Sequence, residues 1–368
     1  MGDNLVFKIA LTLVPSVGAI TAKQLISYCG SAEAVFKTPK AKLLKIPGIG
    51  LQTATAILEF RDFESAEKEI HFLERNGVRA LFYVDADYPS RLKHFPDAPV
   101  MLYVRGTADL NPERVLAVVG TRQPTPQGIV ACEEIIQSLK TYHVQVVSGL
   151  AYGIDAVAHQ AALGAGLPTL AVMGNGLNRI YPAAHKGLAA EIVRQNGALL
   201  TEFLSDTGPD RENFPMRNRI VAAMADALLV VETGARGGSM ITANLANDYN
   251  KDVFAVPGRV KDLKSEGCNN LIKTHKAGLI SSGEDIAYFM QWDPPTEKQP
   301  GIQRTLFTDL APQEQMVLEI MRESADPWSI DRLSYQAQLQ GSEIAAVLLN
   351  LEFKGLVKSL PGKRFLPV

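Results

Sequence analysis

The sequence predicts an α/β protein whose centre is an extended Rossmann-like, doubly wound parallel sheet. Six short apolar runs end in glycine-rich, basic or polar turns, and helical patterns of roughly ten to fifteen residues separate them. Strands that alternate with helices are joined by right-handed crossovers, so they form a parallel sheet with helices on both faces. The runs lie at 115–119, 144–148, 169–173, 198–203, 227–232 and 252–257.

A sheet of this kind binds its ligands beyond the carboxyl ends of its strands. Polar residues that follow or end the runs include Arg122, Ser148, Asn175, Lys186 and Glu232. We therefore expect the functional site at the edge of the sheet where these residues meet.

Composition sets the limits of the functional prediction. The chain has 368 residues, which is room for two or three domains, and its formal net charge is −2. The whole-protein charge gives no reason to expect nucleic acid, so local charge must carry any such prediction. Cys29, Cys132 and Cys268 are far apart, which favours reduced, buried thiols. Without an apolar run of about eighteen residues or a signal pattern, we predict a cytoplasmic protein that contacts no membrane.

Residues 1–84 are expected to form a helical domain in which one short sequence pattern occurs twice. The segments VPSVG (14–18) and IPGIG (46–50) each precede a helical pattern, and they resemble the helix-hairpin-helix, or SAM-like, element. In that element, glycines let the chain turn so that backbone N–H groups can meet a phosphate. The first copy is degenerate because Ser16 replaces a glycine. A plain helical packing domain explains the same pattern, so both interpretations stay open.

The remaining chain divides into three parts. Residues 85–291 contain the sheet domain, and 292–311, rich in proline and polar residues, are expected to be a linker. Residues 312–368 show three helical patterns, with Ser329 and Ser342 as expected N-caps, followed by a hairpin; they resemble a winged helix-turn-helix. Six basic residues against seven acidic ones in that segment favour a protein-interaction module over a DNA contact through the wing.

Several enzyme classes lack their motifs. GNGLNR (174–179) has Arg179 where a dinucleotide loop needs its third glycine, and no GxxxxGK[ST] or GxSxG occurs. The six histidines are scattered, so we predict no metal, no cofactor and no catalytic residue. Glu232 is the best candidate for a catalytic carboxylate, although a strand-end acid that caps a helix or pairs with an arginine is the commoner case.

The polar and basic residues at the strand ends instead predict a binding site for an extended anionic ligand. Arg122 directly follows a strand and precedes a helix, where its guanidinium could bind a phosphate through two parallel hydrogen bonds. Ser148 and Gly149 can bring backbone N–H groups to the same ligand. Asp155 is expected to cap the next helix and to orient Arg122. Tyr181 offers a stacking face, although a turn or core role is equally open to it.

The order of the motifs resembles the DNA processing protein A (DprA, or Smf) family. The motifs are VGTR, SGLAYGIDAVAH, GNGLNRIYPAAH, FPMRNRIV, VVET followed by GSMITA, FAVPG and NNLI. The resemblance implies binding and protection of single-stranded DNA, a homodimer through the Rossmann domain, and loading of the RecA recombinase during natural transformation. The expected contacts with single-stranded DNA are Gly120, Arg122, Ser148, Gly149, Gly174, Asn175, Gly176, Tyr181, His185, Lys186, Arg217, Asn218 and Arg219.

Two departures and two alternatives accompany this resemblance. Thr121 stands where the family usually has serine, and KTHKAG (273–278) replaces a short Gly-Ala turn. One alternative is a Rossmann-type nucleotide phosphoribohydrolase, whose PGGxGTxxE signature the sequence VETGARGGSM does not supply. The other is a transcriptional regulator that uses the C-terminal module.

Overall fold

The structure is a computed structural model that describes residues 2–294, 310–322, 327–354, 356–360 and 364–367. The chain forms two compact units, Met1–Pro295 and Thr296–Val368, each described by itself below. Most of the expected linker, residues 295–309, lies outside the described residues. The division of the first unit at residue 84 stays a prediction.

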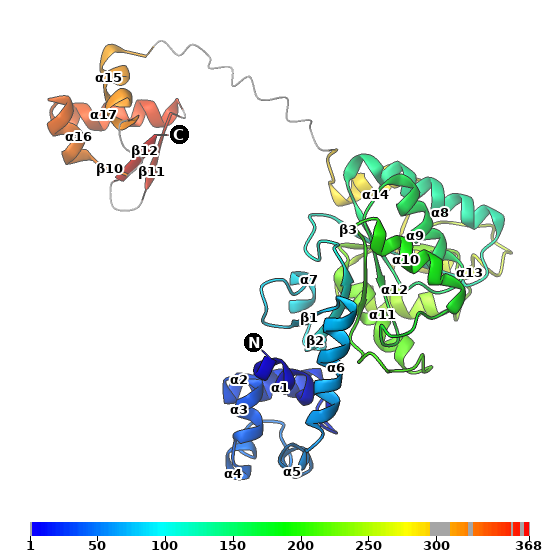
Figure 1. Cartoon of the computed structure of the whole chain (residues 1–368). Helices are drawn as coiled ribbons and strands as arrows, with labels where there is room; N and C mark the ends of the chain where they lie inside the picture. Colours follow the sequence, from blue (N-terminus) through cyan, green and yellow to red (C-terminus); the bar gives the residue numbers. More distant parts are fainter. Residues whose placement is uncertain (1, 295–309, 323–326, 355, 361–363, 368) are drawn as a thin grey trace. The chain divides into compact units, whose positions relative to one another are not determined.

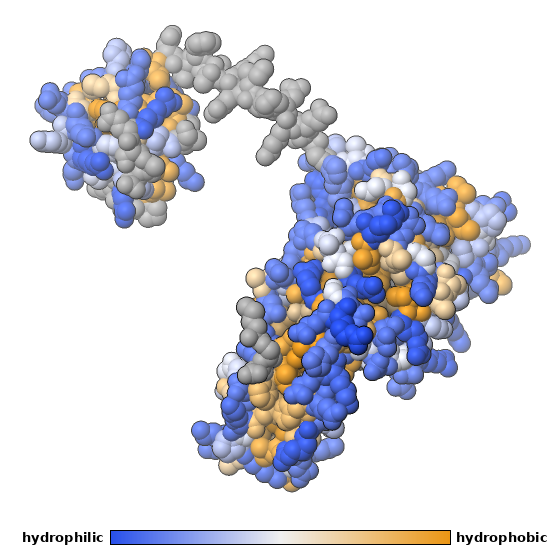
Figure 2. Space-filling view, in the orientation of Figure 1, coloured by the Kyte–Doolittle hydropathy of each residue, from blue (hydrophilic) through white to orange (hydrophobic). Residues whose placement is uncertain are grey.

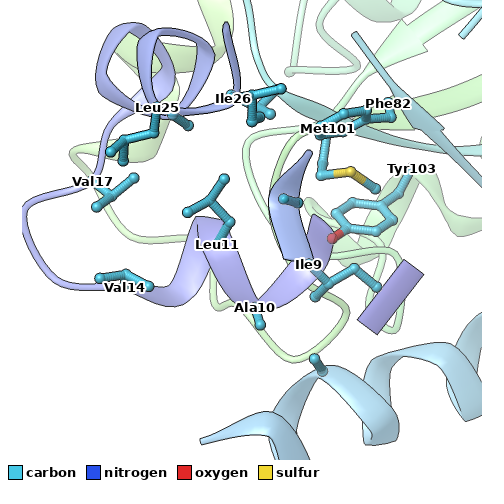
Figure 3. Packing of buried hydrophobic residues seen from close by; sticks show 14 of the residues in the cluster. Ile9, Ala10, Leu11, Val14, Val17, Leu25, Ile26, Phe82, Met101 and Tyr103 are labelled. Atoms are coloured by element: carbon cyan, nitrogen blue, oxygen red, sulfur yellow. The ribbon is translucent and has the colours of Figure 1, made fainter. Parts of the chain in front are cut away.

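The N-terminal helices share one hydrophobic core with the edge of the sheet. Ile9 and Leu11 are completely buried and belong to the same apolar cluster as Met101 and Tyr103 of the sheet (Figure 3). Gly50 directly precedes a helix, as the IPGIG pattern predicts. The helices are α1 (Gly2–Leu13), α2 (Ala19–Cys29), α3 (Ala32–Lys37), α4 (Lys40–Leu43), α5 (Leu51–Glu59) and α6 (Phe63–Asn76).

The sheet has nine strands in the part of the chain that the structure describes, in the order β1-β2-β6-β5-β4-β3-β7-β8-β9. The pairs from β6 to β9 are parallel, whereas β2 pairs antiparallel with β6 and β1 antiparallel with β2. The predicted Rossmann-like sheet is therefore confirmed, with an antiparallel extension at one edge. The strands are β1 (Arg79–Phe82), β2 (Met101–Gly106), β3 (Val115–Gly120), β4 (Gln145–Ser148), β5 (Thr169–Val172), β6 (Ala198–Thr201), β7 (Ala227–Val231), β8 (Asp252–Ala255) and β9 (Gly278–Leu279).

Helices cover both faces of this sheet, as a doubly wound fold requires (Figure 1). One face packs against α8 (Pro126–Ser138), α9 (Ile154–Ala165) and α14 (Gly283–Met290). The other packs against α7 (Ser90–Lys93), α11 (Asn213–Met224), α12 (Gly238–Asp248) and α13 (Glu266–Lys273). The helix α10 (Lys186–Arg194) joins the cluster of the N-terminal helices.

The cysteines are free, and two of the three are buried. Burial raises the pKa of the Cys132 thiol, and likewise that of Cys268, to about 12, so both stay protonated. On the face drawn in Figure 2, hydrophilic residues cover α6, and hydrophobic residues show beside it along the N-terminal helices. Among the described residues, none of the helices has the length and apolar character needed to span a bilayer.

The second unit has the elements of a winged helix. In its described residues, a small antiparallel sheet of β10 (Trp328–Ser329), β12 (Arg364–Pro367) and β11 (Val357–Leu360) accompanies three helices. Ser329 caps its helix as predicted, because its Oγ accepts a hydrogen bond from the N–H of Arg332. The expectation for Ser342 was wrong, since Gln340 is the N-cap and Ser342 lies inside the first turn. The helices are α15 (Pro312–Arg322), α16 (Ile330–Ala337) and α17 (Gly341–Phe353).

Candidate functional site

The loops after five neighbouring parallel strands open at the same edge of the sheet. These strands lie in the order β5, β4, β3, β7 and β8, each about 4.8 Å from the next. Their loops therefore lie side by side in that order, although they are scattered along the sequence. The loops cover residues 173–185, 149–153, 121–125, 232–237 and 256–265.

A pocket of about 710 Å³ opens at this edge. Its wall comes from the end of β3 and its loop, from the loop after β7, from the start of α9, and from the first two turns of α11 and α12. Of the residues that the sequence singled out as DNA contacts, the wall contains Gly120, Arg122, Tyr181, Arg217 and Asn218. These five come from three separate segments, namely the end of β3 with its loop, the loop after β5, and α11, and the fold brings them together.

Two buried residues of opposite charge, Arg217 and Asp155, form the floor of the pocket. Arg217 of α11 is 4% exposed, and its guanidinium donates hydrogen bonds to the carbonyls of Gly149 and Val172. Asp155 is buried beside it and accepts a hydrogen bond from the N–H of Ala151 (3.3 Å). Burial raises the pKa of the Asp155 carboxyl, and the charge of Arg217 opposes this rise. Arg217 thus places a fixed positive charge under the pocket.

Asp155 therefore acts differently from the sequence expectation. Its strongest charge partner is Arg217, and Arg122 has a smaller electrostatic effect on it. Its carboxylate holds the chain that precedes α9, through the N–H of Ala151. The residue stabilises the loop before the helix and the arginine beneath it.

The loop between β4 and α9 needs two glycines because it runs tightly between neighbours. A Cβ atom on Gly149 would lie 2.2 Å from Nη1 of Arg217. A Cβ on Gly153 would lie 2.2 Å from the carbonyl oxygen of Thr121, and Gly153 also has a φ of +78°, which strains residues with side chains. The loop thereby fixes the backbone at Arg122 on one side and Arg217 on the other.

The same loop contacts the segment that begins α10. The Nδ1–H of His185 donates a hydrogen bond to the carbonyl of Leu150 (2.9 Å), and the exposed ring of Tyr152 lies 5.1 Å from the His185 ring. Lys186 follows directly, at the first residue of α10, and is exposed. His185 therefore positions Lys186 beside the loop.

Ser148 lies inside the sheet. Its Oγ donates a hydrogen bond to the carbonyl of Val118 (2.6 Å), and the residue is completely buried. Its side chain therefore ties β4 to β3 beneath the site.

The turn at 174–176 supports an aromatic wall. Asn175 is buried, and its Nδ2 donates to the carbonyls of Gly176 (2.8 Å) and Arg179 (2.7 Å). A Cβ on Gly174 would lie 2.9 Å from the ring of Phe214, whose centroid is 5.7 Å from that of Tyr181. The turn thus shapes the wall from behind, and the two rings face the pocket.

Positive charge gathers along this edge of the sheet, and Arg122 and Arg211 line the pocket itself. The side chains of Arg122, Lys186, Arg211 and Arg236 are exposed, and none of them forms a hydrogen bond or ion pair with the residues that the structure describes. The N-terminus of α12 also lines the pocket, has no acidic residue in its first turn, and favours an anion. By contrast, Arg219 pairs with Glu202 and lies outside the wall.

The Glu232 carboxylate has a structural role. Its carboxylate accepts hydrogen bonds from the N–H (2.8 Å) and the hydroxyl of Thr125, the N-cap of α8. A Cβ on Gly128 would lie 2.4 Å from the same carboxylate. The strand-end acid thus holds the start of α8 in place, which is the commoner role that the sequence suggested for it.

Three residues of this site were missed at the level of sequence. Phe214 and Arg211 line the pocket, and Tyr152 is an exposed aromatic side chain in the loop before α9. A signal for Phe214 was present, because it directly precedes Pro215 in the stretch that supplied Arg217. Nothing local distinguishes Arg211, whose position depends on how the chain turns before α11.

Comparison with known proteins identifies the family. The model of the DNA recombination-mediator protein A family matches residues 79–291, which is more than half of the chain. The chain belongs to this family. Within it, the DNA recombination-mediator protein A segment is flanked by a match to a helix-hairpin-helix motif at residues 8–70 and by one to the DprA winged helix domain at 304–363.

Relatives in the DNA recombination-mediator protein A family cover most of the chain. Protein Smf of Synechocystis is 30% identical and covers 97% of this chain and of its own length. Protein Smf of Escherichia coli is 34% identical, over 88% of this chain and 86% of its own.

Two solved structures are similar to this chain. The structure of DNA processing protein A from Streptococcus pneumoniae aligns with 78% of this chain and 98% of its own, at 31% identity and a TM-score of 0.67. A structure from Helicobacter pylori, whose subject is the single-stranded DNA binding mode of DNA processing protein A, aligns with 58% of this chain and 95% of its own, at 29% identity and a TM-score of 0.53.

Proposed function

We propose that the protein binds single-stranded DNA in the pocket at the carboxyl edge of its sheet. The observation that carries this proposal is the pairing of unpartnered cations with aromatic rings in one pocket. Among the described residues, Arg122 and Arg211 lack hydrogen-bonding partners, and Tyr181 and Phe214 stand in the same wall. Cations meet phosphates and rings stack on bases, which is the combination that single strands require. The Helicobacter pylori relative supports the same ligand class.

The geometry suggests how the strand is held. Arg122 can bind a phosphate through two parallel hydrogen bonds, and the free N–H groups at the start of α12 can meet the same or the next phosphate. Tyr181, which is partly exposed, can stack on a base. In a duplex the bases are paired and stacked, so they offer no free face, and a single strand is therefore preferred.

We also propose that binding involves no chemical step. Glu232 is the carboxylate that a nucleotide phosphoribohydrolase would need, and it is bonded to the cap of α8. Incubation of the protein with nucleoside monophosphates should release no free base. Release that disappears in Glu232→Gln would contradict this part of the proposal.

Family membership supports a role in recombination, namely protecting incoming single strands and loading RecA during natural transformation. Purified full-length protein should then retain RecA in a pull-down, and failure to do so would remove this role.

We also propose a homodimer through the sheet domain. The edge strand β9 exposes Leu279, and α14 exposes Tyr288 and Phe289 nearby. Light scattering should give twice the monomer mass for the wild type and the monomer mass for Leu279→Glu.

The ligand can be tested directly by competition. A labelled single-stranded oligonucleotide bound to the protein should be displaced by unlabelled single strand at much lower concentration than by duplex of the same sequence. Equal displacement by duplex would move DNA binding away from this pocket, to the helix-hairpin-helix or winged-helix parts.

A further inference from the structure

The loop after β8 carries positive charge that the pocket does not use. Residues 258–265 contain Arg259, Lys261 and Lys264 against one acid, Asp262. The Asp262 carboxylate accepts hydrogen bonds from the N–H of Lys264 (3.0 Å) and the Oγ of Ser265 (3.4 Å), so it shapes the turn. The Asp262 carboxylate is therefore occupied by hydrogen bonds within the loop.

The fold places this loop directly beside the wall of the pocket. The Nζ of Lys264 donates a hydrogen bond to the carbonyl of Gln123 (2.6 Å), the residue after Arg122. Directly after the loop, in the first turn of α13, the N–H of Gly267 donates to the carbonyl of Thr233 (2.8 Å), and Thr233 lines the pocket. These two hydrogen bonds hold the loop beside Arg122 and anchor the helix that follows it to the pocket wall.

The exposed side chains of the loop lack partners in the described part of the chain. Arg259 and Lys261 are exposed, and their side chains form no hydrogen bond or ion pair there. Val260 and Leu263 are 96% and 78% exposed, so apolar side chains alternate with the cations on the surface of the loop. Cations alternating with apolar groups match a ligand that alternates phosphates with apolar base and sugar surfaces.

The order of the strands places basic residues in a row across this edge of the sheet. Lys186 lies at the β5 loop, Arg122 at the β3 loop, Arg236 at the β7 loop and Arg259 at the β8 loop. Four strand spacings separate β5 from β8, which is about 19 Å at about 4.8 Å each. A stacked strand places a phosphate about every 3.4 Å, so this length exceeds what one or two nucleotides in the pocket would cover.

We propose that loop 258–265 binds the part of a DNA single strand that leaves the pocket, with Arg259 and Lys261 contacting its phosphates. The inference rests on the proposed function and deepens it, because it adds a second contact region and gives the bound strand a direction across the sheet. Val260 and Leu263 lie against the bases or sugars of that part. The loop then lengthens the DNA segment that one protomer covers.

The test is the dependence of affinity on oligonucleotide length. Fluorescence anisotropy is measured with oligothymidylates from about four to about sixteen nucleotides, the range of site sizes known for single-strand binders. The proteins are the full-length wild type, Arg259→Ala/Lys261→Ala, Arg122→Ala and the control Lys273→Ala/Lys276→Ala. The control removes the same charge at the other end of α13, about 12 Å of helix from the loop.

The expected result for the loop variant is a loss that appears only with long strands. The shortest oligonucleotides should bind Arg259→Ala/Lys261→Ala and wild type alike, and long ones should bind the variant at least about tenfold more weakly. For long strands the log–log salt slope should shrink by about 1.4, at about 0.7 for each lost phosphate contact. The control should match wild type at every length.

Other results overturn the inference. A loop variant that equals wild type at every length, or that loses the same factor at every length, excludes a contact with the outgoing strand. A variant that binds all strands normally but no longer retains RecA assigns the loop to a protein partner instead. Arg122→Ala reports separately on the proposed function, because loss of the pocket contact must weaken even the shortest strands.

Discussion

Removing Arg217 should destabilise the sheet unit more than removing any exposed arginine near the pocket. The substitution Arg217→Met keeps much of the side-chain length and deletes the charge. It leaves the carbonyls of Gly149 and Val172 without their donor and leaves the Asp155 carboxylate buried without its partner. Leaving a buried charge without the opposite charge that compensates it costs about 3–5 kcal/mol, so the free energy of unfolding should fall by that amount.

The assay must report on the first unit alone. The chain has two tryptophans, Trp292 and Trp328, and Trp292 packs against the core beneath α8 and α14. Urea unfolding followed by Trp292 fluorescence in a Trp328→Phe background isolates that unit. Arg236→Met serves as the matched control and should change stability by less than about 0.5 kcal/mol, because Arg236 is exposed.

A double-mutant cycle separates the electrostatic interaction of Arg217 with Asp155 from other effects of the substitution. If Arg217 is needed chiefly to compensate Asp155, then Asp155→Asn should recover part of the loss, and the two substitutions should couple by about 1–3 kcal/mol. Losses that add within about 0.5 kcal/mol, or an Arg217→Met variant as stable as wild type, would refute the compensation of Asp155 by Arg217 under the pocket.

Two further predictions follow from the helix α9 and its N-terminus. Gly153→Ala should lower stability by about 1–3 kcal/mol and weaken DNA binding, because the new Cβ collides with the backbone that holds Arg122; Gly164→Ala, in open space on the same helix, should do neither. His159 is buried with a pKa lowered to about 3 by desolvation, whereas the unfolded chain takes up a proton near pH 6.5. Stability should therefore fall by up to about 1.4 kcal/mol per pH unit as the pH drops from about 6.5 towards 3, and His159→Gln should flatten that part of the unfolding curve. An unchanged pH profile in His159→Gln would show that another group is responsible.

The order of secondary structure could be predicted from sequence because each strand is a short apolar run. The runs at 115–119 and 227–232 became β3 and β7, which are neighbours in the sheet. The antiparallel pairing of β2 with β6 could not be predicted, because no local pattern tells which strand an edge strand joins.

The site was harder to predict, since burial decides what a polar side chain does. Ser148 has the sequence position of a ligand contact, yet its hydroxyl bonds within the sheet. Arg217 and Arg219 are two residues apart on α11, roughly 200° around the helix, so one enters the pocket floor and the other pairs with Glu202. The electrostatic interaction of Arg217 with Asp155 joins distant parts of the chain, and only the folded sheet brings them together.

The most direct test of the central claim is the salt dependence of single-strand binding in Arg122→Ala. Anisotropy titrations at several salt concentrations should give a log–log slope of about −3 for wild type if the site neutralises about four phosphates. Arg122→Ala should bind more weakly at each salt concentration and reduce the slope by about 0.7. Lys140→Ala, beyond the far end of α8 and about 20 Å of helix away, should match wild type. An Arg122→Ala slope equal to that of wild type, or the same reduction in Lys140→Ala, would contradict binding of single-stranded DNA in this pocket.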